Sequence, residues 1–369
     1  MALHHLFRDP VLFTAMAAAV LSALFVPPSK KYFGYLDLRV LCLLLSLMLV
    51  VAGLQKAGVF DFVIKRLLRL VQNTRTLSAV LVGVCFFSSM LITNDVALIT
   101  FVPLTIMMLT RAQKQKLLIA IVVLQTVAAN LGSMLTPLGN PQNLYLYSLS
   151  NMTTGQFLSV MAGPTAVSLL LLAVLIAFMK PEPIPAWMDT TTETAGVQQA
   201  LPWVVLFMVC LLAVLRILPY SLALVSVLVG VAMFDRSILF RADYNLLFTF
   251  TFLFIFIGNM KNLPAVSTAL SSLVSGRELF IGILLSQVIS NVPAAMLLSN
   301  FTSNYSALLI GVNLGGLGTL IASMASVISY KLYASTPDAR TGKFLVVFTG
   351  VNVLFLGILW GIAALYIAM

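Results

Sequence analysis

Residues 130–143 read Asn-Leu-Gly-Ser-Met-Leu-Thr-Pro-Leu-Gly-Asn-Pro-Gln-Asn and lie within an apolar segment, 117–147, that is long enough to cross a membrane. Glycine and proline interrupt the helix there, and amide side chains gather at the interruption. Broken backbone at membrane depth is tolerated only where it is buried in protein or lines a cavity. The stretch therefore predicts a discontinuous transmembrane helix at a binding site, with a packing kink of small residues as the alternative.

Composition assigns the whole chain to the membrane. Of its 369 residues, 61% are hydrophobic and 9% are charged, whereas soluble domains carry about 25% charged residues. The mean hydropathy is +1.07. The basic residues behind the net charge of +10 lie in short loops, so the expected partner is the lipid bilayer and not nucleic acid. The cysteines are scattered in apolar segments and the histidines lie in the N-terminal tail, so no metal site and no cofactor is expected.

Apolar runs separated by short polar segments give the expected order of elements. The spans are 11–27, 36–58, 117–147, 156–179, 202–218, 221–235, 243–260, 305–333 and 344–368. Residues 181–201, rich in proline, threonine and charge, are expected to form a cytoplasmic linker between a first transmembrane repeat, 1–180, and a second, 202–369. The basic stretch 60–75 is amphipathic and predicts an interfacial helix, with a plain loop as the alternative.

Segment 77–110 has basic residues at both ends, which the positive-inside rule assigns to the cytoplasm. One straight span cannot begin and end on the same side, whereas a re-entrant helical hairpin can, and Thr93-Asn94-Asp95 forms a polar break at its middle. The resulting topology places the N-terminus and 15 of the 21 basic residues inside. It places both ends of a second hairpin, 279–302, outside, so the two hairpins enter from opposite faces. The basic residues left outside are Lys30, Lys31, Arg39, Arg216, Lys261 and Arg277.

An internal repeat supports this topology. A shift of 197 positions aligns residues 92–97 (Ile-Thr-Asn-Asp-Val-Ala) with 289–294 (Ile-Ser-Asn-Val-Pro-Ala), and a shift of 183 aligns 130–136 with 313–319. The starts of two spans also match, at Asp37 and Asp243. The expected fold is an all-α polytopic membrane protein with two inverted-topology repeats. Each repeat carries a re-entrant helical hairpin and a discontinuous transmembrane helix, the latter within 117–147 and 305–333.

Asp95 is the only one of the 11 acidic residues expected deep in the bilayer. An intramembrane carboxylate costs several kcal/mol and persists where it faces a cavity, a partner or an ion. We expect Asp95 to carry a coupling proton or Na⁺; capping of the following half-helix is an alternative that is compatible with this role. No lysine or arginine is evident at the midplane, so an anion would be neutralised by backbone dipoles, amide and hydroxyl donors, and co-bound cations.

The hairpin tips and the helix breaks supply the candidate substrate- and ion-binding residues. They are Thr93, Asn94, Asp95, Asn130, Gly132, Thr136, Gly139, Asn140, Asn143, Ser290, Asn291, Asn313, Gly315, Thr319 and Ser323. The repeat-related amides Asn94, Asn130, Asn291 and Asn313 are expected to converge on one central site, since amides offer oxygen to a cation and N–H to a solute. The two tips are candidate Na⁺ sites, and no other metal ion is expected.

The motifs at residues 91–98, 129–143, 286–294 and 312–323 resemble those of the ion transporter superfamily. This superfamily includes divalent-anion/sodium symporters, citrate transporters, arsenite permeases and one class of Na⁺/H⁺ antiporters. The chain is most similar to its YbiR-type bacterial branch, whose members are described as anion transporters. The resemblance covers nearly the whole chain. It implies a scaffold domain and a transport domain, an elevator-like motion and a homodimer in the bacterial inner membrane.

The residues at the two hairpin tips distinguish the subfamilies of this superfamily. Anion symporters of the superfamily carry Ser-Asn-Thr at both tips, whereas here the first reads Thr93-Asn94-Asp95 and the second, 290–292, reads Ser-Asn-Val. The asparagines carry over and the final threonine does not, which argues against sodium/dicarboxylate symport. Asn-Asp at the first tip is more similar to arsenite permeases, and an ionisable tip suits proton coupling.

Together these features predict a secondary active transporter of a small anion or oxyanion-like solute, of the carboxylate or metalloid class, coupled to H⁺ or Na⁺. The rival functions are a Na⁺/H⁺ antiporter that uses Asp95, an arsenite-type efflux permease and, least favoured, a passive channel. An intramembrane enzyme is not expected, because no span contains a histidine and no acidic pair is present.

Overall fold

The computed structural model describes residues 10–68, 71–184 and 197–368, and the regular elements in these ranges are all helical. Six of these helices are long and apolar enough to cross a membrane, and a seventh span is added if the bent pair Pro264–Val274 and Glu278–Ile289 is taken as one. The expectation of an all-α polytopic membrane protein is therefore confirmed for the described part of the chain.

The first half of the chain contains both kinds of expected helix break. Its elements are α2 (Pro10–Ala23), η1 (Lys30–Tyr35), α3 (Leu38–Lys56), α4 (Val59–Leu68), α5 (Thr74–Ser88), α6 (Asn94–Arg111), η2 (Gln115–Leu117), α7 (Leu118–Ser133), α8 (Pro141–Leu149) and α9 (Thr154–Ala177). One break separates α5 from α6 and the other separates α7 from α8. The 15 residues of α5 reach only about 22 Å, so this helix is too short to cross about 30 Å of hydrocarbon alone.

The second half repeats this succession after two further helices. Its elements are α10 (Val197–Val214), α11 (Tyr220–Phe234), η3 (Arg236–Arg241), α12 (Tyr244–Lys261), α13 (Pro264–Val274), α14 (Glu278–Ile289), α15 (Asn291–Leu298), α16 (Tyr305–Leu314), η4 (Leu320–Ala322), α17 (Met324–Ala334) and α18 (Thr341–Ala368). α10 begins inside the segment 181–201 that was expected to be linker, of which residues 185–196 lie outside the described ranges. α13 was not predicted, and it follows α12 as α4 follows α3.

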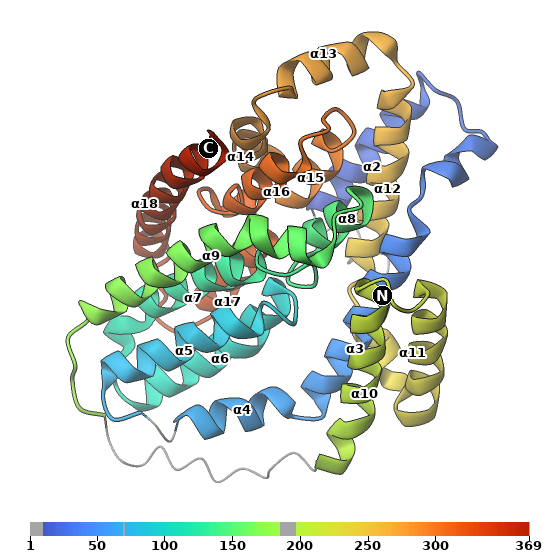
Figure 1. The fold of residues 1–369 in the computed structure, drawn as a ribbon. Coiled ribbons are helices and arrows are strands. Elements are labelled where there is room, and N and C mark those ends of the chain that lie inside the picture. The colour runs from blue at the N-terminus through green and yellow to red at the C-terminus, as the bar shows by residue number, and fades with distance from the viewer. Residues whose placement is uncertain (1–9, 69–70, 185–196, 369) are drawn as a thin grey trace.

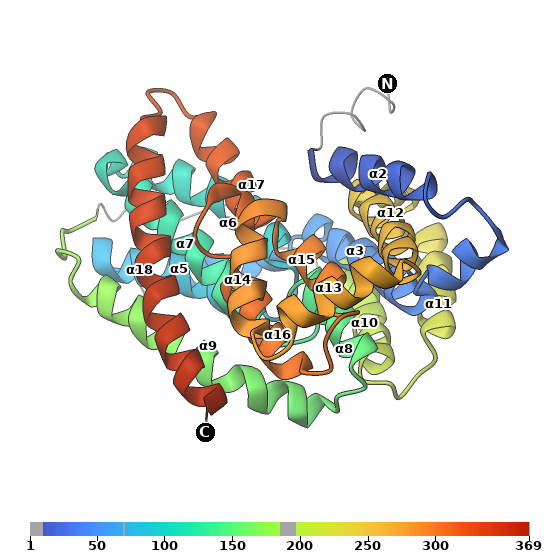
Figure 2. The same ribbon diagram turned by 90° about the horizontal axis from the view of Figure 1, so that it is seen from above.

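The helices form two bodies, which Figures 1 and 2 show side by side. The first, here called the frame, consists of α2, α3, α10, α11 and α12 with η1 and η3. The second, here called the hairpin body, contains α5 to α9 and α14 to α18. The amphipathic helices α4 and α13 connect the bodies along opposite edges of the molecule (Figure 1). The bodies meet where α8 packs against α3 and α15 packs against α12.

Matching caps begin the two frame helices α3 and α12. Asp37 Oδ1 accepts a hydrogen bond from the Val40 N–H at 3.1 Å, and Asp243 Oδ1 accepts one from the Leu246 N–H at 3.1 Å. Such a cap satisfies one backbone donor that has no partner within the helix and stabilises the helix by about 1 kcal/mol. The sequence therefore placed both aspartates correctly, at the starts of helices.

Both ends of the first hairpin meet the start of the linker. The Thr74 N–H, at the start of α5, donates to the Glu182 carbonyl at 2.9 Å. Lys114, which follows α6, forms an ion pair with the Glu182 carboxylate, and this hydrogen bond lowers the pKa of Glu182. The outer ends of α5 and α6 therefore lie at the same end of the molecule.

A second ion pair lies at the end of the frame helix α3. Lys56 Nζ lies 2.5 Å from Asp235 Oδ2 and 2.8 Å from Ser237 Oγ, which joins α3 to the α11–η3 connection. The hydrogen bond from Lys56 lowers the pKa of Asp235 to about 2. The Asp235 carboxylate therefore stays ionised at neutral pH.

Candidate functional site

The first hairpin tip is bonded to the first helix break through Asn94. The Asn94 N–H donates to the Gly139 carbonyl at 3.1 Å, and Asn94 Nδ2 donates to Asn130 Oδ1 at 3.0 Å. Thr136 Oγ1 donates to the Met90 carbonyl, just before the tip. These bonds hold the start of α6 against both sides of the break between α7 and α8.

Asn130 joins the first half of the chain to the second. Its Oδ1 also accepts a hydrogen bond from Ser323 Oγ at 2.9 Å, and its Nδ2 donates to Ser326 Oγ at 3.4 Å. Asn130 is buried, and a buried amide left without partners costs about 1–3 kcal/mol. These contacts therefore fix α7 against the start of α17.

Asn313 makes the reciprocal connection, from the second break back to the first. Its Oδ1 accepts from Asn140 Nδ2 at 3.0 Å, and its Nδ2 donates to Asn143 Oδ1 at 2.7 Å and to the Leu309 carbonyl at 2.8 Å. Asn140 caps α8, because its Oδ1 accepts from the Asn143 N–H at 2.9 Å. Asn143 Nδ2 donates to three carbonyls of the 133–136 turn. The end of α16 and the start of α8 are thereby held together.

One bracing contact occurs once in each half of the chain. Thr136 Oγ1 donates to the Met90 carbonyl, and Thr319 Oγ1 donates to the Gln287 carbonyl at 3.2 Å. Positions 90 and 287 are related by the shift of 197, and positions 136 and 319 by the shift of 183. Each helix break therefore braces its own hairpin tip in the same way.

Gly132 and Gly315 permit the same close approach in the two halves. A Cβ on Gly132 would lie 2.7 Å from Ser89 Oγ and 2.1 Å from the Phe86 carbonyl oxygen. A Cβ on Gly315 would lie 2.6 Å from Ser286 Oγ, and positions 89 and 286 are again related by the shift of 197. Any larger side chain would push each broken helix away from its hairpin.

A cavity of about 420 Å³ lies between the two bodies. The hairpin body contributes Thr93 and Asp95 from the first tip and Ser290 and Val292 from the second. The polar residues that the frame contributes are Gln55, Arg241, Asp243 and Thr249. Thr93 and Ser290 are the N-cap residues of α6 and α15, and neither side chain makes a capping hydrogen bond. Two helix N-termini, each with partial positive charge, therefore border one cavity.

The second tip is held in a strained conformation. Ser290 has a φ of 75° and a ψ of 155°, a region that favours glycine and costs other residues about 1–3 kcal/mol. Its Oγ donates to the Ala322 carbonyl at 3.3 Å, which attaches the tip to the second helix break. Strain of this kind concentrates at ligand-binding sites, where the surrounding structure fixes a residue for function.

Asp95 is half-buried at the wall of the cavity and does not cap α6. The Asp95 N–H bonds to Asn94 Oδ1 at 3.0 Å, but within the described residues the Asp95 carboxylate has neither a hydrogen bond nor an ion pair. A carboxylate in this setting is available to a proton or a cation. The geometry therefore gives no support to a purely capping role.

The other candidate residues do not line the cavity. Asn94 and Asn130 bond to each other, while Asn313 belongs to the neighbouring cluster with Asn140. Asn291 bonds to none of these amides within the described ranges, although a Cβ built on the adjacent Gly316 would lie 2.9 Å from its Nδ2. These amides bond to one another, to serine hydroxyls and to backbone, so their geometry suits positioning of the tips better than contact with a solute.

Four polar lining residues were not among the sequence candidates. Arg241 and Asp243 had been assigned to a loop and a span end, and Thr249 had no distinguishing feature. Gln55 was the one with a usable signal, as an amide near the end of an otherwise apolar span. It donates to Thr100 Oγ1 at 3.2 Å, so it connects the frame to α6.

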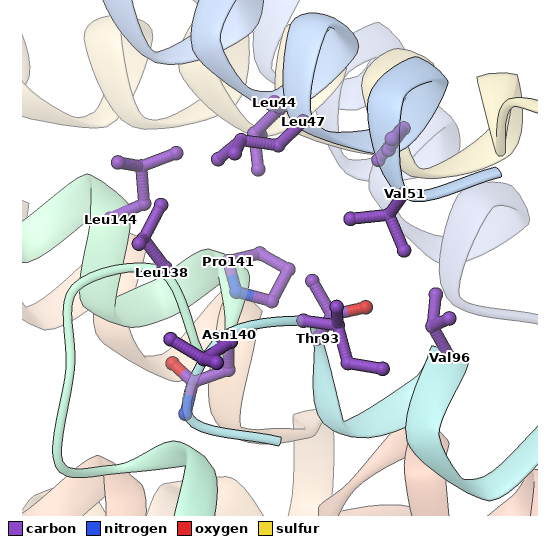
Figure 3. A pocket seen from close by; sticks show the side chains of 12 residues that line it. Leu44, Leu47, Val51, Thr93, Val96, Leu138, Asn140, Pro141 and Leu144 are labelled. Carbon is purple, nitrogen blue, oxygen red and sulfur yellow. The ribbon is translucent and has the colours of Figure 1, made fainter. Parts of the chain in front are cut away.

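An apolar contact between α3 and the first break closes one side of the cavity region. Figure 3 shows Leu44, Leu47 and Val51 of α3 on one side and Leu138 and Leu144 on the other. The gap between them has a volume of only about 30 Å³, and its lining is mostly apolar. The frame and the hairpin body therefore meet here without polar cross-links.

Family models provide an independent comparison. The model described as "Citrate transporter" matches residues 6–305. The chain belongs to the citrate transporter family. This membership confirms the resemblance to the ion transporter superfamily.

Relatives of this citrate transporter family member are themselves named as membrane or transport proteins. The chain is 30% identical over 322 residues to the uncharacterized transporter MJ0456 of Methanocaldococcus jannaschii, and the match covers 86% of each chain. It is 32% identical over 315 residues to the inner membrane protein YbiR of Escherichia coli, covering 84% of this chain and 83% of the relative. The uncharacterized transporter Rv2685 of Mycobacterium tuberculosis is 25% identical over 334 residues, covering 79% and 78%. With the apolar helices, these matches indicate a multi-pass membrane protein that is a secondary transporter.

Proposed function

We propose that this member of the citrate transporter family moves a small anion or oxyanion-like solute, coupled to H⁺ or Na⁺, through the cavity that Asp95 lines. The observation that carries the proposal is the meeting of both tips at this cavity. The N-termini of α6 and α15 and the hydroxyl of Thr93 favour a negatively charged group. Asp95 would take the proton or Na⁺ that travels with the solute or against it.

Carboxylates are the first substrate class to test, with oxyanions and metalloids second. The family model is that of citrate transporters, and the cavity volume lies within the range of about 300–1,000 Å³ common for small-molecule sites. The test is uptake of radiolabelled citrate, succinate, phosphate and arsenite into sealed proteoliposomes under a pH gradient or a Na⁺ gradient. We expect one gradient to drive accumulation of at least one solute. Uptake at the level of empty liposomes for all four solutes would contradict the proposal.

A Na⁺/H⁺ antiporter is the second candidate function, and one observation favours it. Asp95 and Asp243 both line the cavity, and two carboxylates favour a cation. In this case, Na⁺ added outside proteoliposomes would release internal protons without any organic solute. A dye that reports internal pH separates this function from solute transport.

We propose that the two repeats have inverted topology and that each hairpin is re-entrant. The matched bracing contacts of Thr136 and Thr319, and the positions of α4 and α13 on opposite edges, support this arrangement. The joint contact of Thr74 and Lys114 with Glu182 supports a hairpin whose ends share one side.

Single-cysteine labelling tests this topology in a variant without the three native cysteines. We expect cysteines at Gln72 and Gln115 to react with an impermeant maleimide only from the cytoplasmic side. A cysteine at Ser303, next to the second hairpin, should react only from the outside. Labelling of positions 72 and 115 from opposite sides would rule out a re-entrant first hairpin.

We also propose that the cavity faces the cytoplasm in this conformation. Gln55, on its lining, directly precedes Lys56, and Arg241, also on its lining, lies in the same 3-10 helix as Arg236. The charge rule assigns both Lys56 and Arg236 to the inside. An elevator-like motion of the hairpin body against the frame would then expose the tips to the other side. The superfamily resemblance adds a homodimer in the inner membrane, with a cytoplasmic N-terminus.

Arg216 provides a test of this motion, because it bonds across the two bodies. Its Nη2 donates to the Tyr147 carbonyl, near the end of α8, at 2.7 Å, and its guanidinium carbon lies 4.9 Å from the centre of the Tyr147 ring. Arg216→Gln should lower the population of this conformation, relative to the one that faces the other side, by about tenfold. The reason is that a hydrogen bond from a charged group contributes about 1.5–3 kcal/mol. The measurement is the rate at which a cysteine at Val292 reacts from the cytoplasmic side.

The control for Arg216→Gln is Arg277→Gln, which removes another charge that the topology places outside. We expect slower labelling of position 292 in Arg216→Gln and an unchanged rate in Arg277→Gln. Equal rates in the two variants would show that the Arg216 contact does not report on the position of the hairpin body.

A further inference from the structure

Arg241 is a cationic side chain on the lining of the cavity, and it belongs to the frame. It ends η3, which packs on α3 and α11, whereas Thr93, Asp95 and Ser290 come from the hairpin body. The cavity is therefore bordered by two bodies with different electrostatic character. The hairpin body offers helix N-termini and the Asp95 carboxylate, and the frame offers the Arg241 guanidinium and the Asp243 carboxylate.

The guanidinium of Arg241 has no polar partner in the part of the chain that the structure describes. Within the described residues it makes no hydrogen bond and no ion pair, because the ion pairs found there are those of Lys56 and Lys114. Arg236, in the same 3-10 helix, differs from it, since Arg236 Nε donates to the Ala232 carbonyl at 3.3 Å. Within the described ranges, Arg241 thus keeps its donors unbonded at a position that borders the cavity.

The neighbouring carboxylates do not remove this capacity. Asp243 also lines the cavity, but its Oδ1 accepts the Leu246 N–H as the cap of α12. No ion pair between Arg241 and either Asp95 or Asp243 is present within the described ranges. A planar guanidinium with free donors is the side chain best matched to the two oxygens of a carboxylate or to an oxyanion.

We infer that Arg241 is an anion-binding site on the frame side of the cavity, which takes a carboxylate or oxyanion group of the solute while the tips face this side. The inference rests on the proposed function for the solute's charge. Because Arg241 and the tips belong to different bodies, movement of the hairpin body would separate the solute from Arg241. Arg241 therefore strengthens solute binding on the cytoplasmic side alone and gives the transporter unequal affinities on its two sides.

Chemical modification tests occupancy of Arg241 without requiring transport. Purified protein in lipid nanodiscs is treated with phenylglyoxal, and modification of Arg241 and Arg236 is followed by peptide mass spectrometry. Citrate, succinate and phosphate are each compared with chloride at equal ionic strength. We expect at least one of the three anions to slow modification of Arg241 severalfold and to leave Arg236 unchanged. Unaltered modification of Arg241 with all three anions, or equal protection of Arg236, would overturn the anion site.

Transport kinetics test the one-sided effect. Arg241→Gln should raise the half-saturating solute concentration about tenfold in everted vesicles, because the variant cannot make a charge-assisted hydrogen bond to the anionic group of the solute. The value in right-side-out vesicles should not change, and Arg241→Lys should lie between Arg241→Gln and the unaltered protein. Arg236→Gln is the matched control, since it removes a charge from the same element. An equal increase on both sides would contradict the inference.

The two experiments distinguish this inference from the proposed function. Protection of Arg241 by an anion without gradient-driven uptake would leave the anion site in place and remove the coupled transporter. Gradient-driven uptake without protection of Arg241 would remove the anion site alone.

Discussion

Replacing Asp95 by asparagine is expected to abolish gradient-driven transport and to leave folding and membrane insertion intact. Asparagine has nearly the same shape but cannot carry a negative charge, so it can neither release a proton nor neutralise Na⁺. The Asp95 carboxylate makes no hydrogen bond or ion pair within the described residues, so its removal breaks no contact seen there. The measurement is uptake into proteoliposomes under a pH or Na⁺ gradient, which should fall to the level of empty liposomes.

Two further substitutions serve as controls for Asp95→Asn. Asp61→Asn removes an exposed carboxylate from α4, outside the cavity, and should leave uptake unchanged. Asp243→Asn removes the other cavity carboxylate while asparagine can still cap α12, and coupling should persist. Normal coupled uptake by a well-expressed Asp95→Asn protein would show that Asp95 does not carry the coupling ion.

Gly132→Ala is expected to destabilise the hairpin body and to stop transport. The added methyl group would lie 2.1 Å from the Phe86 carbonyl oxygen, which belongs to backbone and cannot rotate away. α7 must then move away from α5, and overpacking of this kind costs about 1–3 kcal/mol. Thermal unfolding in detergent should show a lower melting temperature, and solute uptake should be lost because Asn130 moves with α7.

Gly350→Ala is the matched control in the interior of another helix. A Cβ on Gly350, in α18, would meet no atom within 4 Å. Alanine favours the helix over glycine by about 1 kcal/mol, so this variant should be as stable as the original protein or more so. An equally stable Gly132→Ala protein would mean that the contact between α7 and α5 is not as close as described.

Sequence patterns predicted the helix breaks correctly, because the cause of a break is local. Glycine, proline and polar residues within an apolar run mark the gaps between α7 and α8 and between α5 and α6. The short amphipathic helix α4 was predicted from its basic face. α13 was not predicted, because residues 264–274 carry no charge to mark a polar face.

Only part of the candidate site could be predicted from the sequence. Thr93, Asp95 and Ser290, which the sequence analysis named, line the cavity, and their polar character in an apolar run was the signal. Arg241 and Asp243 reach the same cavity because η3 and the start of α12 pack beside the tips, which lie about 150 and about 50 positions away in the sequence. No local pattern encodes such a contact, so the chain order alone left both residues in loops or at span ends.

The asparagines show the same limit in a different way. Composition predicts that buried amides need partners, but it does not say whether the partner is a solute or the protein itself. In the structure Asn130 and Asn313 bond to Ser323 and Asn140, across the two halves of the chain. The expected convergence on a solute therefore stays a prediction for these residues, and their observed contacts join the two helix breaks.

Solute-driven ion movement is the most direct test of the central claim, that the cavity bordered by both tips carries a solute together with, or in exchange for, an ion. Sealed proteoliposomes start without any ion gradient, and a transported solute identified by uptake is added outside. Internal pH is followed with a trapped dye and Na⁺ with ²²Na. We predict that the solute gradient moves one of these ions in the original protein and neither in Asp95→Asn. Entry of the solute with no movement of H⁺ or Na⁺ in the original protein would contradict coupling and would indicate a passive channel.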